Sequence, residues 1–393
     1  MDGDEDLLRS EDGRDDAKGG GLRERIAHFT WANFTCTQST GGIAILLSLT
    51  PHQFYGLQTA GVVIFIFNLV LFMLFCTMMI VRFVLHPYMV KRSFTNPPEL
   101  FFFGSFWLSM ATVIICIQQF GVPNAGDWIV TTIRVLFWIY AAVTLVYTTV
   151  IWVVVAARSP IDPLHISPAI FLMIFNTMLS GTIAGSIAQS QPPAQRLPII
   201  VAGIAYQGLG WIMCTILLPW FIGNFLSNGL GTPDQRPGLF MPVGSSGYTV
   251  VSLIGCARSL PRGYGFFARF PGAVDVLQVV ATWVSIFLWL FAFWLFAIAL
   301  VANLPVMLPD RQMRPRMGFT LSWWGLVFPN VGLTIATTMI GEELQSDAVQ
   351  WVATVMTILL FVVWLMDLGL HVKALVTGQI MWPGKDEDVL KSS

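Results

Sequence analysis

The sequence predicts an all-α integral membrane protein with ten transmembrane helices, arranged as five helical hairpins in a quasi-fivefold ring. In this ring the odd-numbered helices are the inner ones and line a central pore. Hydrophobic residues make up 55% of the 393-residue chain and charged residues only 11%, whereas soluble domains carry about 25% charged residues. Several apolar stretches exceed the ~20 residues that a helix needs to span a bilayer. Similar segments also recur along the chain, which indicates an internal repeat.

The domain boundaries follow from where the apolar segments begin and end. Residues 1–27 are rich in acidic and polar residues and lack the apolar core of a signal peptide. We therefore expect this segment to be a disordered acidic cytoplasmic tail. Residues 28–376 form the predicted ten-helix membrane domain, and residues 377–393 form a predicted cytoplasmic C-terminal tail.

The predicted spans alternate between two kinds. Their expected ranges are 29–49, 57–85, 99–120, 128–157, 167–189, 198–227, 238–258, 273–304, 318–341 and 346–376. The even-numbered spans are long and evenly apolar, whereas the odd-numbered spans are shorter and polar near the middle. Four of the five odd spans have proline at or just before the start. Proline is tolerated there because the N–H groups of a first helical turn have no partner within the helix. This alternation predicts five two-helix hairpins whose odd members run in the same direction.

Basic residues predict the orientation in the membrane. Sixteen of the 21 lysines and arginines lie on the side of the N-terminal tail, four lie on the other side, and Arg134 lies within a span. Because basic residues accumulate on the cytoplasmic side, both termini are predicted to be cytoplasmic. An even number of spans is consistent with that placement.

Small polar residues cluster in the middle of the odd spans, as in TQSTGG (37–42) and GSSGYT (244–249). One such cluster is explained by close helix packing, because helix interfaces in membranes favour small residues. Five clusters in phase favour a second interpretation, in which they form the wall of a polar path. The candidate binding residues in these segments are Gln38, Ser39, Thr40, Ser109, Thr112, Ser180, Thr182, Ser245, Ser246, Thr249, Asn330 and Thr334.

The charge pattern along the odd spans favours an anion as the permeating species. No Asp or Glu falls in the middle of an odd span. With the N-terminus inside, all five odd helices begin on the cytoplasmic side, and each helix N-terminus carries about half a positive charge. Arg258 ends an odd span and is a candidate contact for a substrate carboxylate, although a role as an interface anchor is equally open.

Phe328 precedes the helix-breaking Pro329 in WWGLVFPN and is a candidate gate, with ordinary packing as the alternative. The histidines and the five cysteines show no metal-ligand spacing, and no phosphate-binding loop of the GxxxxGK[ST] type occurs. We therefore expect no catalytic residues, metal or cofactor. The formal net charge of −1 gives no reason to expect a nucleic-acid partner.

Several segments together resemble the fungal malic acid (C4-dicarboxylate) transporters. They are HFTWANFTCTQSTGGIAILL, RFVLHP, LFFFGSFWLSMAT, RVLFWIY, MLSGTIAGSIAQSQPP and SWWGLVFPN, and the resemblance runs from residue 28 to about residue 375. These transporters belong to the tellurite-resistance/dicarboxylate transporter family, with fungal sulfite efflux pumps and plant slow anion channels. The resemblance implies a quasi-fivefold ring of ten helices, assembly as trimers, and a pore-occluding phenylalanine that corresponds to Phe328.

Two transport functions follow as hypotheses. The first is movement of C4-dicarboxylate anions (malate, succinate, fumarate) across the plasma membrane, either channel-like or proton-linked through the monoanion. Carboxyl groups of this kind titrate near pH 4, so a transported monoanion carries a proton with it and no buried proton relay is needed. The alternative is efflux of sulfite or another small anion. An intramembrane enzyme is disfavoured because the odd spans lack paired catalytic groups.

Overall fold

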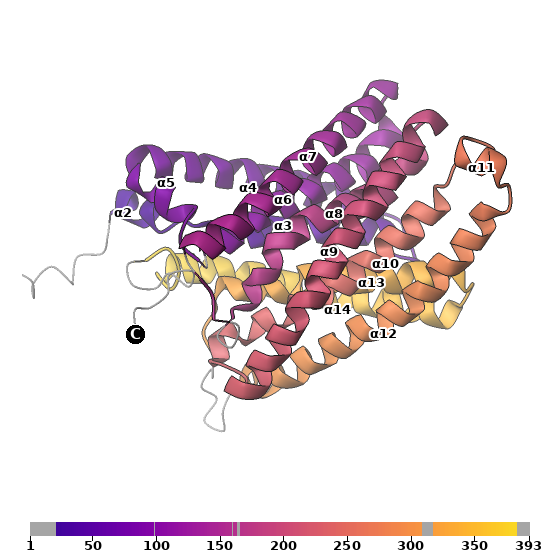
Figure 1. Ribbon diagram of the computed structural model, residues 1–393. Coiled ribbons are helices and arrows are strands. Elements are labelled where there is room, and N and C mark those ends of the chain that lie inside the picture. The colour runs from indigo at the N-terminus through magenta and orange to yellow at the C-terminus, as the bar shows by residue number, and fades with distance from the viewer. Residues whose placement is uncertain (1–20, 98, 159, 163–165, 309–316, 383–393) are drawn as a thin grey trace, which may run out of the picture.

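The computed structural model describes residues 21–97, 99–158, 160–162, 166–308 and 317–382, and this part of the chain contains helices and no strand. Figure 1 shows the long helices side by side in one bundle. Their bounds are α3 Phe34–Leu49, α4 Leu57–Leu85, α6 Glu99–Cys116, α7 Asp127–Arg158, α8 Leu172–Ile187, α9 Pro193–Asn228, α10 Val243–Arg258, α12 Ala273–Met307, α13 Phe328–Glu343 and α14 Asp347–Val376. The short helices are α2 Leu22–Ala27, α5 Tyr88–Ser93 and α11 Phe266–Arg269. Residues 1–20 of the predicted N-terminal tail and 383–393 of the predicted C-terminal tail lie outside the described residues, and Leu22–Ala27, at the end of the first tail, form α2.

The helices alternate in length as the sequence predicts. Helices α3, α8, α10 and α13 have 16 residues each and α6 has 18. The helices that follow them, α4, α7, α9, α12 and α14, have 29, 32, 36, 35 and 30 residues. Short 3₁₀ turns (η1, η5, η7 and η8) precede four of the five shorter helices, at Trp31–Asn33, Pro168–Phe171, Pro233–Phe240 and Leu321–Leu326.

Nine helical segments of the described chain are long and apolar enough to cross a membrane. The chain is therefore an all-helical, multi-pass membrane protein. The first predicted span corresponds to α3, which has only 16 residues, many of them polar in its first half. That α3 is a tenth membrane span therefore stays a prediction.

Burial separates the shorter helices from the longer ones. The nine segments differ in the buried share of their most apolar stretch. It is 67–94% in the segments that contain α6, α8, α10 and α13, and 28–33% in the five longer helices. The exposed side chains of the longer helices are large and apolar, for example Val70 on α4 and Phe287 on α12. Because such a surface is stable only against lipid, the longer helices form the outer layer and the shorter helices the inner one.

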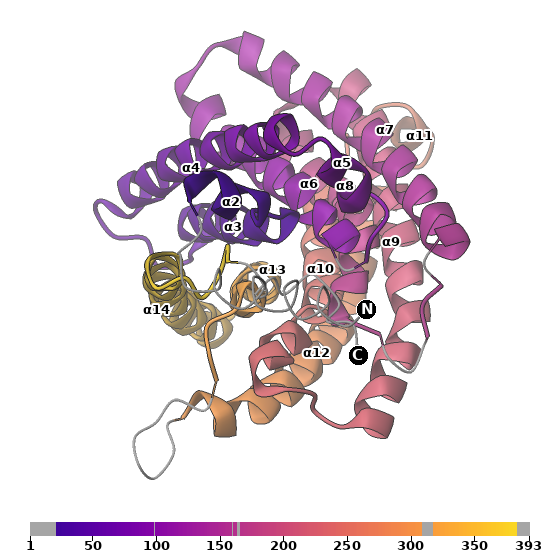
Figure 2. The same cartoon turned by 90° about the vertical axis from the view of Figure 1, so that its left-hand side faces the viewer.

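The inner helices contact one another in a closed order. Helix α3 packs on α6, α6 on α8, α8 on α10 and α10 on α13, and α13 returns to α3. Each outer helix lies against two inner helices, as α12 lies against α10 and α13. The view along the bundle shows the inner helices surrounded by the outer ones (Figure 2). This order of contacts supports the predicted ring, whose fivefold symmetry remains a prediction.

Glycines allow the inner helices to approach closely. A Cβ atom on Gly104 of α6 would lie 2.3 Å from the Leu172 carbonyl oxygen, and one on Gly247 of α10 would lie 2.7 Å from the Leu333 backbone nitrogen on α13. Both distances are too short for any side chain. The glycines of the odd spans therefore include packing positions, as the first interpretation of these segments proposed.

A buried ion pair fixes the end of the bundle where the inner helices begin. Arg82 of α4 and Glu99 of α6 are 2% and 1% exposed, and the Arg82 Nη1 donates to the Glu99 Oε1 at 2.5 Å. The Arg82 Nε donates to the Ala27 carbonyl oxygen of α2 at 3.0 Å. Arg25 of α2 also donates to the Leu375 carbonyl oxygen at the end of α14. The first and last described helices therefore meet at this end, opposite α11 (Figure 1).

Candidate functional site: a cavity inside the ring of inner helices

A cavity of about 200 Å³ lies inside the ring and is lined by residues of all five inner helices and of the turns that follow them. The lining residues are Ile45, Leu49, Thr112, Ile115, Gln119, Leu179, Thr182, Gly185, Ser186, Gln189, Tyr248, Val251, Gly255, Arg258, Ser259, Phe328, Val331, Ile335, Thr338, Met339 and Glu342. None of them belongs to an outer helix. The cavity is therefore enclosed by the inner ring and screened from lipid by the outer layer.

The mouth of the cavity lies where the inner helices end. Arg258 is the last residue of α10 and Glu342 is the next-to-last residue of α13, and their side chains are 33% and 42% exposed. Gln189, which follows α8, is also exposed. The cavity thus opens at the α11 end of the bundle, away from the helix N-termini that the sequence suggested as an anion-attracting vestibule. At helix C-termini the dipole disfavours anions, so Arg258 is the group that favours an anion at this mouth.

Two aromatic rings line the inner end of the cavity and pack on each other. The ring centroids of Tyr248 and Phe328 are 5.0 Å apart, and the Tyr248 hydroxyl donates to the Phe328 carbonyl oxygen at 2.9 Å. Both side chains are almost fully buried. A Cβ atom on Gly332 would lie 2.8 Å from the Tyr248 ring, and one on Gly42 would lie 3.4 Å from the Phe328 ring. Glycines of α13 and α3 thus provide the space in which these rings pack.

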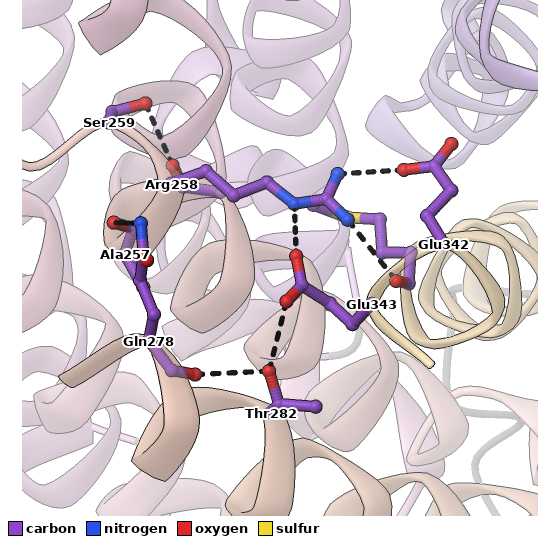
Figure 3. Close-up of polar contacts among 9 residues, drawn as sticks. Ala257, Arg258, Ser259, Gln278, Thr282, Glu342 and Glu343 are labelled. Carbon is purple, nitrogen blue, oxygen red and sulfur yellow. Dashed lines mark hydrogen bonds and ion pairs between the residues drawn. The ribbon is translucent and has the colours of Figure 1, made fainter. Parts of the chain in front are cut away.

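Arg258 is held by two carboxylates of α13 (Figure 3). Its Nη1 donates to the Glu342 Oε2 at 2.7 Å and its Nε donates to the Glu343 Oε1 at 2.6 Å. Its Nη2 donates to the Met339 carbonyl oxygen at 3.3 Å. The Thr282 hydroxyl of α12 donates to the second oxygen of Glu343 at 3.2 Å. The guanidinium therefore ties α10, α13 and α12 together at the mouth, and the cluster has one formal positive and two formal negative charges.

Four of the fourteen predicted site residues line this cavity, namely Thr112, Thr182, Arg258 and Phe328. The other ten lie outside its lining: Gln38, Ser39, Thr40, Ser109, Ser180, Ser245, Ser246, Thr249, Asn330 and Thr334. All ten are buried.

Some of these ten join neighbouring helices through hydrogen bonds. Thr40 accepts from the Trp364 Nε1 at 3.1 Å, Thr249 accepts from the Gln207 Nε2 at 2.9 Å, and Ser109 pairs with Thr37. Others have a polar atom without a hydrogen-bond partner among the described residues: Gln38 Oε1, Ser180 Oγ, Ser246 Oγ and Asn330 Oδ1. That these unpaired atoms line a path that continues past the aromatic pair stays a proposal.

Reasoning from the sequence did not select Tyr248, Glu342, Gln119 or Gln189, all of which line the cavity. Tyr248 lies within the GSSGYT segment, but its pairing with a residue 80 positions later is a tertiary contact without a local signal. Glu342 lies at the end of a predicted odd span, where the sequence gives no reason to expect a partner. The order of the inner helices places it beside Arg258, and that order is not readable from one segment.

Known proteins resemble this chain over nearly its whole length. The sequence profile of the voltage-dependent anion channel family matches residues 28–372. The chain is 33% identical to a malic acid transport protein of Schizosaccharomyces pombe over 367 residues, which cover 93% of this chain and 83% of that protein. It is 27% identical to a sulfite efflux pump of Trichophyton rubrum over 354 residues, which cover 88% of this chain and 91% of the pump.

These similarities agree with the cavity inside the helical ring. They concern transport proteins and an anion channel family rather than enzymes. The resemblance to fungal malic acid transporters that the sequence motifs indicated is confirmed. The chain belongs to the voltage-dependent anion channel family and is an anion-transporting membrane protein.

Proposed function

We propose that this protein carries C4-dicarboxylate anions such as malate, succinate and fumarate across the plasma membrane. The observation that carries the proposal is the cavity that all five inner helices line, in which Arg258 is the single cationic group among the described lining residues. The side-chain amides of Gln119 and Gln189 supply uncharged hydrogen-bond donors for a second carboxyl group, whereas the hydroxyls of Thr112 and Thr182 donate to the Ser109 and Tyr248 carbonyl oxygens at 2.8 and 3.4 Å. The 33% identity to a malic acid transport protein supports the same substrate class.

The wider setting belongs to the same proposal. Ten spans, cytoplasmic termini and assembly as trimers follow from the sequence and the family resemblance, and the closed contacts of the inner helices support the ring. Cross-linking of the purified protein in membranes tests the trimer.

Transport of the monoanion makes uptake proton-linked without a proton relay, because the carboxyl groups of the substrate titrate near pH 4.

The direct test is uptake of labelled malate into proteoliposomes that contain the purified protein. We expect uptake above that of empty liposomes, with succinate and fumarate as competitors and with greater uptake at pH 5 than at pH 7. Uptake no faster than into empty liposomes contradicts the proposal.

Sulfite efflux is the second candidate, and the similarity to a sulfite efflux pump favours it. Arg258 separates the two, because a dicarboxylate needs a cationic contact more than a small anion does. We expect Arg258→Gln to reduce malate flux about tenfold or more, because it removes one charge-assisted hydrogen bond that contributes about 1.5–3 kcal/mol. Sulfite flux should fall by less. Equal losses for both anions contradict a specific role of Arg258 in dicarboxylate binding.

A further inference from the structure

We infer that Glu342 is an internal carboxylate that occupies Arg258 when no substrate is bound, and that a substrate carboxylate replaces it. The inference rests on the proposed function, because it takes Arg258 as the anion contact. It adds a residue that competes with the substrate. It also identifies carboxylates and other oxyanions as the chemical class that binds at this site.

The two carboxylates on Arg258 are not equivalent. Glu343 also accepts the Thr282 hydroxyl, and its side chain is 24% exposed. Thr282 lies one turn beyond Gln278, which donates to the Ala257 carbonyl oxygen, so Glu343 is part of a connected contact between α10, α12 and α13. Figure 3 shows this chain of contacts on one side of the guanidinium and Glu342 on the other.

Glu342 has the properties of a replaceable ligand. Its side chain lines the cavity and is 42% exposed, and Arg258 is the one side-chain partner recorded for it among the described residues. Exposed ion pairs contribute little to stability, because water solvates both partners well when they separate. Rotation of Glu342 toward solvent therefore frees the Nη1 edge of Arg258 while Glu343 and the Met339 carbonyl still hold the guanidinium in place.

Electrostatics requires replacement rather than addition. The cluster already has one positive and two negative formal charges. A third carboxylate at the same guanidinium would face two like charges within a few ångströms, and repulsion at that distance is substantial in a partly desolvated site. An incoming carboxylate that takes the place of Glu342 at Nη1 keeps the number of contacts on Arg258 constant.

The test measures anion binding and transport separately in Glu342→Gln. Binding of malate, sulfite and chloride to the purified protein is followed by tryptophan fluorescence, and flux is measured in proteoliposomes. We expect Glu342→Gln to tighten malate binding about threefold to tenfold, since the competing carboxylate is lost. Glu343→Gln removes the same negative charge but leaves Glu342 on the Arg258 Nη1, so we expect it to tighten malate binding by less than Glu342→Gln does.

Asp275→Asn is the matched charge control. Asp275 pairs with Arg262 at 2.5 Å at the same end of the bundle, and both side chains are largely exposed and outside the cavity lining. This variant changes the net charge by the same amount as Glu342→Gln, and malate binding should stay within about twofold of the wild type.

The outcomes for this inference differ from those for the proposed function. Unchanged or weaker malate binding in Glu342→Gln overturns the inference, as does a wild-type protein that binds none of the three anions. An equal gain in Asp275→Asn also overturns it, since the effect is then one of general surface charge. Malate binding that Glu342→Gln tightens, in a wild-type protein that does not transport malate, supports the inference and contradicts the proposed function.

Discussion

At the scale of single residues, the contacts that distinguish this cavity come from residues far apart in the sequence. Phe328 was predicted from the helix-breaking proline that follows it and Arg258 from a charge at the end of a span, and both line the cavity. Pro329 does not break a helix here, because it lies in the first turn of α13, where proline is tolerated. Their partners Tyr248 and Glu342 were not predicted, because pairing between helices leaves no mark on the hydrophobic pattern of either helix. Sequence patterns thus identify residues that are unusual in a membrane, and the fold determines which of them meet.

Removal of the Phe328 ring tests its predicted role as a gate. The ring lines the inner end of the cavity together with Tyr248. We expect Phe328→Ala to raise anion current in whole-cell recordings about tenfold, which corresponds to a barrier lowered by about 1.4 kcal/mol. Phe240→Ala is the control, since Phe240 is also a buried phenylalanine but packs on Phe296 outside the cavity lining. A current unchanged in Phe328→Ala removes this residue from the mechanism.

The Tyr248 hydroxyl offers a finer test of the same closure. It donates to the Phe328 carbonyl oxygen at 2.9 Å. Tyr248→Phe keeps the ring and removes one hydrogen bond of about 1 kcal/mol, so we expect up to about a fivefold shift toward the conducting state. Tyr140→Phe is matched to it, because the Tyr140 hydroxyl donates to the Asn176 carbonyl oxygen at 2.7 Å outside the cavity lining. Similar currents in both variants argue that the hydroxyl of Tyr248 only stabilises the fold.

At the scale of helices, the sequence determined the long elements well and the short ones poorly. The predicted spans 57–85 and 128–157 correspond to α4, Leu57–Leu85, and α7, Asp127–Arg158. Long apolar runs have a length that only a membrane-spanning helix explains. The 3₁₀ turns before the inner helices and the π-helical turn at Ile117–Gly121 were not predicted, because they depend on local hydrogen bonding rather than on hydrophobicity.

Close packing of the inner helices predicts that glycine positions differ sharply in their tolerance of alanine. A Cβ atom on Gly247 would lie 2.7 Å from the Leu333 nitrogen. We expect Gly247→Ala to destabilise the protein by about 1–3 kcal/mol and to lower transport, because α10 and α13 must separate. Gly223→Ala in the outer helix α9, where nothing lies within 4 Å, should leave the melting temperature equal or slightly higher. Equal melting temperatures for the two variants contradict this account of the ring.

At the scale of the whole molecule, composition and repeat identified the two layers before any contact was known. Polar, glycine-containing helices alternate with evenly apolar ones in the sequence, and the structure places the first kind inside and the second kind outside. Which half of the inner ring holds the cavity was not predictable. The sequence places the polar segments near the middle of the predicted spans, which does not distinguish one half of the ring from the other. Near the helix N-termini lie large side chains such as Phe34, Phe171 and Trp324, which are fully buried.

Orientation in the membrane is the last property that the whole molecule allows us to predict. Tyr88 in α5 and Tyr264 before α11 lie at opposite ends of the bundle and are 66% and 40% exposed. Sixteen lysines and arginines are assigned to the Tyr88 side and four to the Tyr264 side, so the cavity mouth should face outward. We expect an impermeant maleimide to label Tyr264→Cys on intact cells and Tyr88→Cys only after permeabilisation. The native cysteines give little background, since four are buried and Cys76 lies half-buried within α4. The reverse pattern would place the mouth, with Arg258 and Glu342, on the cytoplasmic side, where the carboxylate exchange would govern export rather than uptake.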